Sequence, residues 1–128
     1  MKVLVIDDDP AMTELLCLLL KPATTDVFVA NSGKHGINLA KEYTPDVIIL
    51  DLMMPEMDGY EVCHKIRSFS STPILVLSAL DMPGMVSKAL DAGADDYLIK
   101  PVTSSILVAH LKNLLRRSDI PDHSVYNQ

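Results

Sequence analysis

The chain has 128 residues, of which 48% are hydrophobic and 22% charged, and its net charge is -6. This length suits one domain with a full core and is too short for two. The acidic balance argues against direct nucleic-acid binding, because phosphate recognition needs a basic footprint. The chain lacks an apolar signal segment and a membrane span, and its two cysteines, Cys17 and Cys63, fit reduced thiols better than a disulfide framework. We therefore expect a cytoplasmic protein without membrane contact.

Five short runs of aliphatic and β-branched residues alternate with five longer segments of helical spacing. The predicted strands are residues 3–6, 27–29, 47–50, 74–77 and 97–99. In the other segments, apolar residues recur three or four positions apart, which is the spacing of one helix face. These faces contain, in chain order, Met12, Leu15, Leu16, Leu19 and Leu20; Ile37 and Ala40; Val62, Cys63 and Ile66; Val86, Ala89 and Leu90; and Leu107, Leu111, Leu114 and Leu115.

This alternation predicts an α/β protein whose parallel sheet is covered by helices on both faces. The strands are continuously apolar, as burial on both faces requires. Right-handed crossovers leave few topologies, and we expect a flavodoxin-like (βα)5 doubly wound parallel sheet with strand order 2-1-3-4-5. Pro83-Gly84 is a poor helix start, so we expect the fourth helix to begin late or to be mobile. Residues 1–117 form the predicted domain, and residues 118–128 a polar tail or linker.

Polar residues follow four of the predicted strands. The first strand runs into Asp7, Asp8 and Asp9, the third into Asp51, the fourth into Ser78, and the fifth into Lys100-Pro101. The carboxyl ends of parallel strands lie at one edge of the sheet, where ligands bind near the reversal of strand order. The topology therefore predicts one pocket that contains several carboxylates, a hydroxyl and an ammonium group.

Some polar residues have simpler interpretations. Asp9 is interpreted as a helix N-cap or first-turn anion, and Asp58-Gly59 as turn and helix-entry residues. The histidines lack the spacing of metal ligands and are interpreted as surface residues: His35, His64, His110 and His123.

The predicted pocket has the parts needed for phosphoryl transfer. Clustered carboxylates repel one another unless a cation intervenes, and a partly open set of oxygen ligands suits Mg²⁺. A carboxylate such as Asp51 can act as a nucleophile and form an acyl phosphate. Mg²⁺ and Lys100 can supply positive charge to the phosphoryl oxygens, and Ser78 a hydrogen bond.

These residues belong to five motifs, and together the motifs resemble the response-regulator receiver domain of two-component signalling. The motifs, in order, are Val5-Ile-Asp-Asp-Asp-Pro10, Asp51-Leu-Met-Met-Pro-Glu-Met-Asp-Gly59, Leu77-Ser-Ala79, Gly93-Ala-Asp-Asp-Tyr97 and Lys100-Pro101. The resemblance covers residues 1 to about 117 and is greatest to the OmpR-type subfamily. It implies a phosphoprotein of a phosphorelay, which catalyses only its own phosphorylation and dephosphorylation and is otherwise not an enzyme.

The resemblance also implies a role for each site residue. Asp51 would accept a phosphoryl group from a sensor histidine kinase. Asp8 would bind Mg²⁺ directly and Asp7 mostly through water, while the backbone carbonyl of Met53 would complete the protein ligands. Lys100 would pair with the phosphoryl oxygens. The remaining implied features are Ser78 and Tyr97 as switch residues, Ala79 as the small residue beside the phosphoryl group, and a cis Lys100-Pro101 bond.

In the family, the side chains two positions after the acceptor and two after the hydroxyl tune hydrolysis of the phosphoaspartate. These positions hold Met53 and Leu80, which cannot orient a water molecule, so slow self-dephosphorylation is expected. Two other classes remain open. A Mg²⁺-dependent aspartyl-phosphate hydrolase would need a second acid where Met53 stands, and a purely structural module would leave the acidic cluster unused.

OmpR-type receivers dimerise through the fourth helix, the fifth strand and the fifth helix, using a network of charges. Three corresponding positions here hold Val86, Ile106 and His110, although other charges remain: Asp95, Asp96, Arg116 and Arg117. A homodimer, an apolar contact with a different partner and simple packing therefore all stay open. The subfamily carries a DNA-binding domain after its linker, which is absent from this sequence. A stand-alone receiver and an excised N-terminal part are both compatible with this length.

Overall fold

The structure, a computed structural model, describes residues 1–23 and 26–119 of the chain. Within these residues, five strands alternate with five helices, as predicted. The strands are β1 (Lys2–Ile6), β2 (Asp26–Ala30), β3 (Val47–Leu50), β4 (Ile74–Ser78) and β5 (Asp96–Ile99). The helices are α1 (Pro10–Leu20), α2 (Gly33–Tyr43), α3 (Gly59–Arg67), α4 (Pro83–Asp91) and α5 (Ser104–Asp119). Helix α5 includes the first two residues of the expected tail, and the rest of that tail lies outside the described residues.

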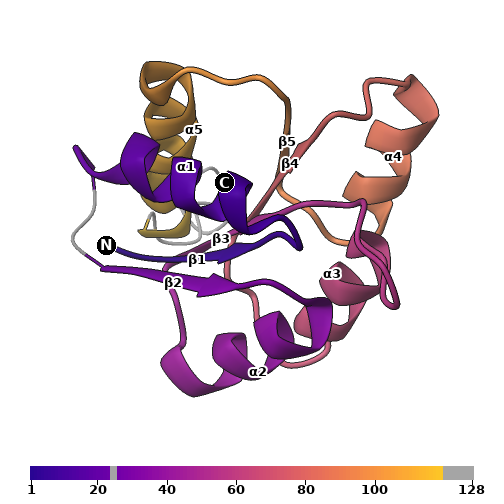
Figure 1. The fold of residues 1–128 in the computed structure, drawn as a ribbon. Coiled ribbons are helices and arrows are strands. Elements are labelled where there is room, and N and C mark those ends of the chain that lie inside the picture. Colours follow the sequence, from indigo (N-terminus) through magenta and orange to yellow (C-terminus); the bar gives the residue numbers. More distant parts are fainter. Residues whose placement is uncertain (24–25, 120–128) are drawn as a thin grey trace, which may run out of the picture.

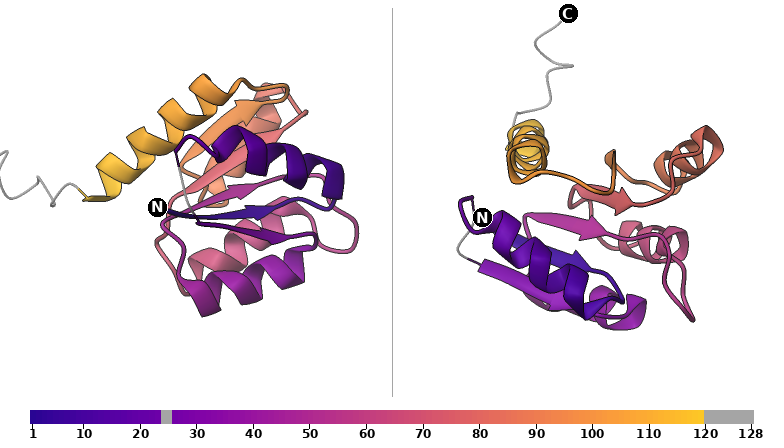
Figure 2. Two further views of the ribbon diagram at one scale, coloured as in Figure 1. Left: turned by 60° about the vertical axis from the view of Figure 1, so that its left-hand side comes forward. Right: turned by 45° about the horizontal axis from the view of Figure 1, so that its top comes forward.

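The strands form one parallel sheet in the order β2-β1-β3-β4-β5, which confirms the predicted topology. Helices α1 and α5 cover one face, while α2, α3 and α4 lie on the other (Figures 1 and 2). The order reverses at β1 and β3, so the carboxyl ends of these two adjacent strands meet where a ligand site is expected. Within the described part of the chain, no helix has the length and apolar composition of a bilayer span.

Alternation along the buried strands divides the core into two clusters. Leu4 and Ile6 of β1 face the helices α2 to α4, whereas Val3 and Val5 face α1 and α5. This follows from the two-residue period of a strand. All residues of β3 and β4 are buried, as their continuous apolar runs predicted. The central strands are therefore rigid supports for the residues at their ends.

Side-chain caps explain where most of these helices begin. The side chain of Asp9 accepts a hydrogen bond from the Ala11 amide, and that of Asp58 accepts one from the Glu61 amide, so both are N-caps as interpreted from the sequence. Helix α2 is capped by Ser32 in the same way. Each cap satisfies an amide that the helix itself leaves without a partner.

Two expectations about helices were wrong. The expected late start of helix α4 is not found, because Pro83 occupies its first turn, where the fixed φ of proline is favourable and its missing N–H is not needed; the alternative expectation, that α4 is mobile, stays a prediction. Leu15 and Leu90 belong to the predicted apolar faces, yet both are 46% exposed. In α1, the adjacent Leu16 takes the buried position. The spacing of apolar residues defines a stripe along the helix. The rotation of the helix on the sheet decides which residues at the edge of that stripe are buried.

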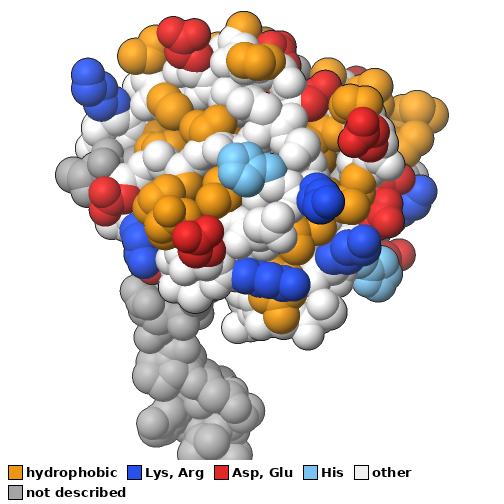
Figure 3. Space-filling view, turned by 60° about the horizontal axis from the view of Figure 1, so that its bottom comes forward, with side chains coloured by type: hydrophobic (Ala, Val, Ile, Leu, Met, Phe, Trp, Pro, Cys, Tyr) orange, Lys and Arg blue, Asp and Glu red, His pale blue; other side chains and the backbone are white. Residues whose placement is uncertain are grey.

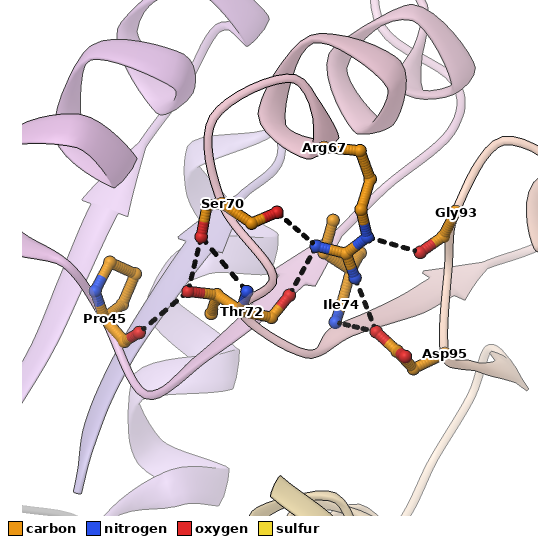
Figure 4. Close-up of polar contacts among 7 residues, drawn as sticks. All are labelled: Pro45, Arg67, Ser70, Thr72, Ile74, Gly93 and Asp95. Atoms are coloured by element: carbon orange, nitrogen blue, oxygen red, sulfur yellow. Dashed lines mark hydrogen bonds and ion pairs between the residues drawn. The ribbon is translucent and has the colours of Figure 1, made fainter.

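At the amino ends of β4 and β5, the guanidinium of Arg67 joins the loop between α3 and β4 to the loop between α4 and β5 (Figure 4). It donates to the backbone carbonyls of Ser70, Thr72 and Gly93 and lies 2.6 Å from the Asp95 carboxylate. The same carboxylate oxygen accepts from the Ile74 amide. Gly93 has φ +113°, and a Cβ there would approach the Arg67 side chain to 2.6 Å. This cluster fixes the end of the β4–β5 pair that is remote from the strand-end carboxylates.

Candidate functional site

Three carboxylates meet at the carboxyl ends of β1 and β3. Oxygen atoms of Asp7, Asp8 and Asp51 all lie within 4.8 Å of one another. Backbone hydrogen bonds extend the sheet to this point, since the Asp51 amide donates to Ile6 and the Asp7 amide to Ala30. Asp7 and Asp51 are buried, and Asp8 is half-buried. The convergence predicted from the topology is therefore present.

Among the described residues, Lys100 has the only ammonium group that pairs with these carboxylates. Its Nζ lies 3.0 Å from Oδ2 of Asp7 and 3.8 Å from Oδ1 of Asp51. The Lys100 amide donates to the carbonyl of Ser78, which ties the residue to the end of β4. The Lys100-Pro101 bond is cis, as the resemblance implied. One positive charge thus faces three carboxylates.

Burial raises the pKa of Asp51 from 3.8 to about 6. Lys100 opposes this rise and so does a hydrogen bond from the Met53 amide, while the charges of Asp7 and Asp8 add to it. Near neutral pH the group is mainly a carboxylate, but a poorly solvated one. Such a carboxylate can act as a nucleophile, and a cation bound beside it would stabilise its negative charge.

Asn31, which the sequence interpretation did not single out, and the backbone of Asp9 hold Asp7 in place. The amide nitrogen of Asn31 donates to the Asp7 backbone carbonyl at 2.8 Å and to the Thr13 hydroxyl at 3.3 Å. The Asp9 amide donates to Oδ1 of Asp7 at 3.0 Å. Asn31 immediately follows β2, so the rule that strand ends converge could have assigned it to this edge of the sheet from the sequence.

The loop from Leu52 to Asp58, here called the Asp51 loop, is folded tightly onto the start of α3. The Gly59 amide donates to the Leu52 carbonyl, and a Cβ at Gly59 would lie 2.5 Å from the Asp51 carbonyl oxygen. Leu52 and Met54 are buried, whereas the side chain of Met53 is 58% exposed. Any side chain at Gly59 would therefore displace the backbone that carries Asp51.

Ser78 and Tyr97 both contact Leu80, in the loop between β4 and α4. The fully buried hydroxyl of Ser78 accepts from the Leu80 amide at 3.2 Å. The hydroxyl of Tyr97 donates to the Leu80 carbonyl at 2.6 Å, and its ring packs against the core under α2, α3 and α4. The two expected switch residues are therefore connected to the segment that leads into α4.

Charges on the surface of α4, β5 and α5 are used within the chain. Nδ1 of His110 lies 2.6 Å from Oδ2 of Asp96, so His110 is not simply a surface residue. Asp95 pairs with Arg67. Arg116 donates to the side-chain oxygen of Asn113. Of the charges that remain on this surface, Asp95 and Asp96 therefore already have partners in their own chain.

The donor set at the carboxyl edge fits a hard divalent cation. Three oxygen ligands converge from two strands, and the one nearby ammonium group does not balance their charge. Oxygen-only coordination with an open side is the arrangement that Mg²⁺ accepts, because this ion retains several water molecules. Asp7, Asp8 and Asp51 are the residues that would hold it.

Comparison with known proteins agrees with this architecture. Residues 3–112 match the family described as the response regulator receiver domain. The chain belongs to this family. It is 40% identical to the DNA-binding dual master transcriptional regulator RpaA of Synechocystis, over 99% of this chain and 54% of the relative. It is 35% identical to the DNA-binding response regulator MtrA of Mycolicibacterium smegmatis, over 99% of this chain and 62% of the relative.

Solved receiver structures have the same fold. The receiver domain of a Francisella response regulator is 34% identical, with a TM-score of 0.85 over 92% of this chain and 98% of that one. A two-component response regulator from Clostridium difficile is 31% identical, with a TM-score of 0.89 over 94% and 99%. The chain thus spans only part of the transcriptional regulators but nearly all of the receiver structures. Its similarity to the DNA-binding relatives is therefore to their receiver part, in agreement with the OmpR-type assignment.

Proposed function

We propose that this receiver domain accepts a phosphoryl group on Asp51 from the phosphohistidine of a sensor histidine kinase. The observation that carries the proposal is the position of Asp51. It is a buried, poorly solvated carboxylate at the end of a rigid strand, beside two further carboxylates and the Lys100 ammonium.

In the proposed step, an Asp51 carboxylate oxygen attacks phosphorus, and the bond from phosphorus to the imidazole nitrogen of the donor breaks. The electron pair of that bond leaves with the imidazole, and Asp51 becomes an acyl phosphate. The Lys100 ammonium lies close enough to pair with the incoming phosphoryl oxygens, and Asp7 holds it there. A bound Mg²⁺ would supply the further positive charge that phosphoryl transfer needs. The backbone carbonyl of Met53 is the remaining proposed ligand.

The acyl phosphate is expected to persist. Met53 and Leu80 carry apolar side chains at the two positions that tune hydrolysis, and neither can orient a water molecule for attack. We therefore propose that the domain catalyses its own phosphorylation and only slow dephosphorylation.

The proposed switch runs through Ser78 and Tyr97. Both hold Leu80, so a phosphoryl group that attracts the Ser78 hydroxyl would change how the β4–α4 loop is held. The output would be a changed surface of α4, β5 and α5. A homodimer through this surface would rely on apolar contacts of Val86 and Ile106 more than on charges, because Asp95 and Asp96 pair within the chain.

The remaining proposals concern partners. A DNA-binding domain C-terminal to this chain would give a transcriptional output. This domain itself is not expected to contact nucleic acid, because it is acidic and because one face shows both charge signs mixed with hydrophobic side chains (Figure 3). We expect a cytoplasmic location, where sensor kinases present their phosphohistidine.

The kinase is proposed to dock over an apolar hollow that borders the acceptor site. This hollow is lined by Met12, Leu15, Leu19, Lys100, Pro101 and Val102. Leu15 is 46% exposed there and Leu18, on the same helix, 62%. A donor helix that covers these side chains would bring its phosphohistidine to Asp51 from the open side.

The test uses acetyl phosphate and Mg²⁺, followed by intact mass spectrometry. The wild type should gain one phosphoryl group, and Asp51→Asn should gain none. No phosphorylation of the wild type, or equal phosphorylation of the variant, would refute the proposal. Leu15→Glu should lower transfer from a kinase while leaving acetyl phosphate labelling unchanged, which separates docking from chemistry. Continuous release of phosphate from small phosphoesters would instead indicate a hydrolase.

A further inference from the structure

Helix α4 is weakly anchored compared with the two helices on the same face of the sheet. Only Ala89 of α4 is buried, whereas α2 and α3 each bury four residues. Its N-cap residue, Met82, makes no side-chain hydrogen bond to the helix, and a Cβ at Gly84 would meet no atom within 4 Å. The position of α4 must therefore depend on contacts from outside the helix.

Tyr60 of α3 makes two such contacts. Its hydroxyl lies 3.3 Å from the backbone carbonyl oxygen of Met85 and 3.3 Å from the sulfur of the same residue. The Nζ of Lys88, one turn further along α4, lies 4.3 Å from the centre of the Tyr60 ring. One side chain thus holds the first turn of α4 by a hydrogen bond and its next turn by a cation–π contact.

The position of Tyr60 in the chain connects this contact to the acceptor site. Tyr60 directly follows Gly59, whose amide and close packing hold the Asp51 loop against the start of α3. A displacement of that loop would move the base of Tyr60. Ser78 and Tyr97 reach α4 by a different route, through Leu80. Helices α3 and α4 are neighbours in the structure (Figure 1).

We propose that Tyr60 is a positioning residue that couples the Asp51 loop to α4 through its own contacts with Met85 and Lys88. In the unphosphorylated chain it holds α4 in the observed place and so opposes the rearrangement that phosphorylation selects. The effect on phosphorylation rests on the proposed function of Asp51, whereas the effect on α4 in the resting protein does not.

The first test is hydrogen exchange of the unphosphorylated protein. Tyr60→Phe removes only the hydroxyl, and the amides of residues 85–92 should exchange roughly two- to twelvefold faster, which is the change in an equilibrium constant that one net hydrogen bond produces. Lys88→Met removes only the cation and should act in the same direction. Tyr43→Phe, a hydroxyl deletion on α2, is the matched control and should leave α4 unchanged. Unchanged exchange in α4, or an equal rise in α2, would overturn the proposal.

The second test is the initial rate of phosphorylation by acetyl phosphate with Mg²⁺. If Tyr60 opposes the rearrangement, Tyr60→Phe should be phosphorylated faster than the wild type, by up to the roughly two- to twelvefold that one net hydrogen bond allows. A merely structural role predicts an unchanged or lower rate together with lower stability, and this result would overturn the coupling. Failure of the wild type to be phosphorylated would refute the function of Asp51, while hydrogen exchange would still decide whether Tyr60 holds α4.

Discussion

Replacing Asp51 by asparagine should stabilise the unphosphorylated domain at neutral pH. The native fold raises the pKa of this carboxyl from 3.8 to about 6, chiefly by burial. A carboxyl whose pKa is higher in the folded state binds its proton more tightly when folded. The free energy of unfolding therefore falls as the pH rises from the unfolded pKa to the folded one, and the full penalty remains above both.

The size of the effect follows from the same values. At roughly 1.4 kcal/mol for each pH unit, the difference between 3.8 and about 6 corresponds to about 3 kcal/mol. This value already includes the attraction of Lys100, which lies 3.8 Å from the Asp51 carboxylate and opposes the rise of its pKa, so the gain should not exceed it. We expect about 1–3 kcal/mol at about pH 7.5 and almost none at about pH 4.

Urea unfolding at both pH values, in the absence of divalent cations, measures this difference. Asp58→Asn is a matched control, because it removes one charge from the same loop while asparagine remains a good N-cap. Added Mg²⁺ should stabilise the wild type more than Asp51→Asn. A variant that is no more stable than the wild type at the higher pH, or whose gain is equal at both, would refute the reasoning.

Three further predictions concern the neighbouring residues. Met53→Asn should shorten the lifetime of the phosphorylated form several-fold, as followed by loss of the phosphoryl group in intact mass spectra; an unchanged lifetime would refute the role of this side chain. Gly59→Ala should reduce both phosphorylation and the free energy of unfolding, because its Cβ would lie 2.5 Å from the Asp51 carbonyl oxygen. A variant with the phosphorylation and stability of the wild type would show that the loop can shift to accept the Cβ. Arg67→Ala should lower the free energy of unfolding by about 2–4 kcal/mol in urea, since it removes the donor of three carbonyls and leaves the Asp95 carboxylate with the Ile74 amide but without its guanidinium partner; a loss below about 1 kcal/mol would contradict this account.

Much of the candidate site was predictable because strand ends in a parallel sheet converge. The apolar runs defined the strands, and the residues directly after them, Asp7, Asp51 and Lys100, were then assigned to one edge without knowledge of any contact. Asn31 follows β2 in the same way and could have been assigned by the same rule. The N-caps Asp9 and Asp58 were equally accessible, because capping depends only on residues a few positions apart.

The sequence by itself therefore determined the sheet, its order and the chemistry at its carboxyl edge, since these depend on local periodicity and on the rules of parallel connections. The tertiary structure alone decided which of two adjacent leucines, Leu15 or Leu16, faces the core. It also decided the pairs that join distant segments, namely Arg67 with Asp95, Asp96 with His110, and Tyr60 with α4. The raised pKa of Asp51 belongs with these features. Helix rotation, long-range pairing and desolvation all depend on how the elements pack together, and no local pattern in the sequence specifies that packing.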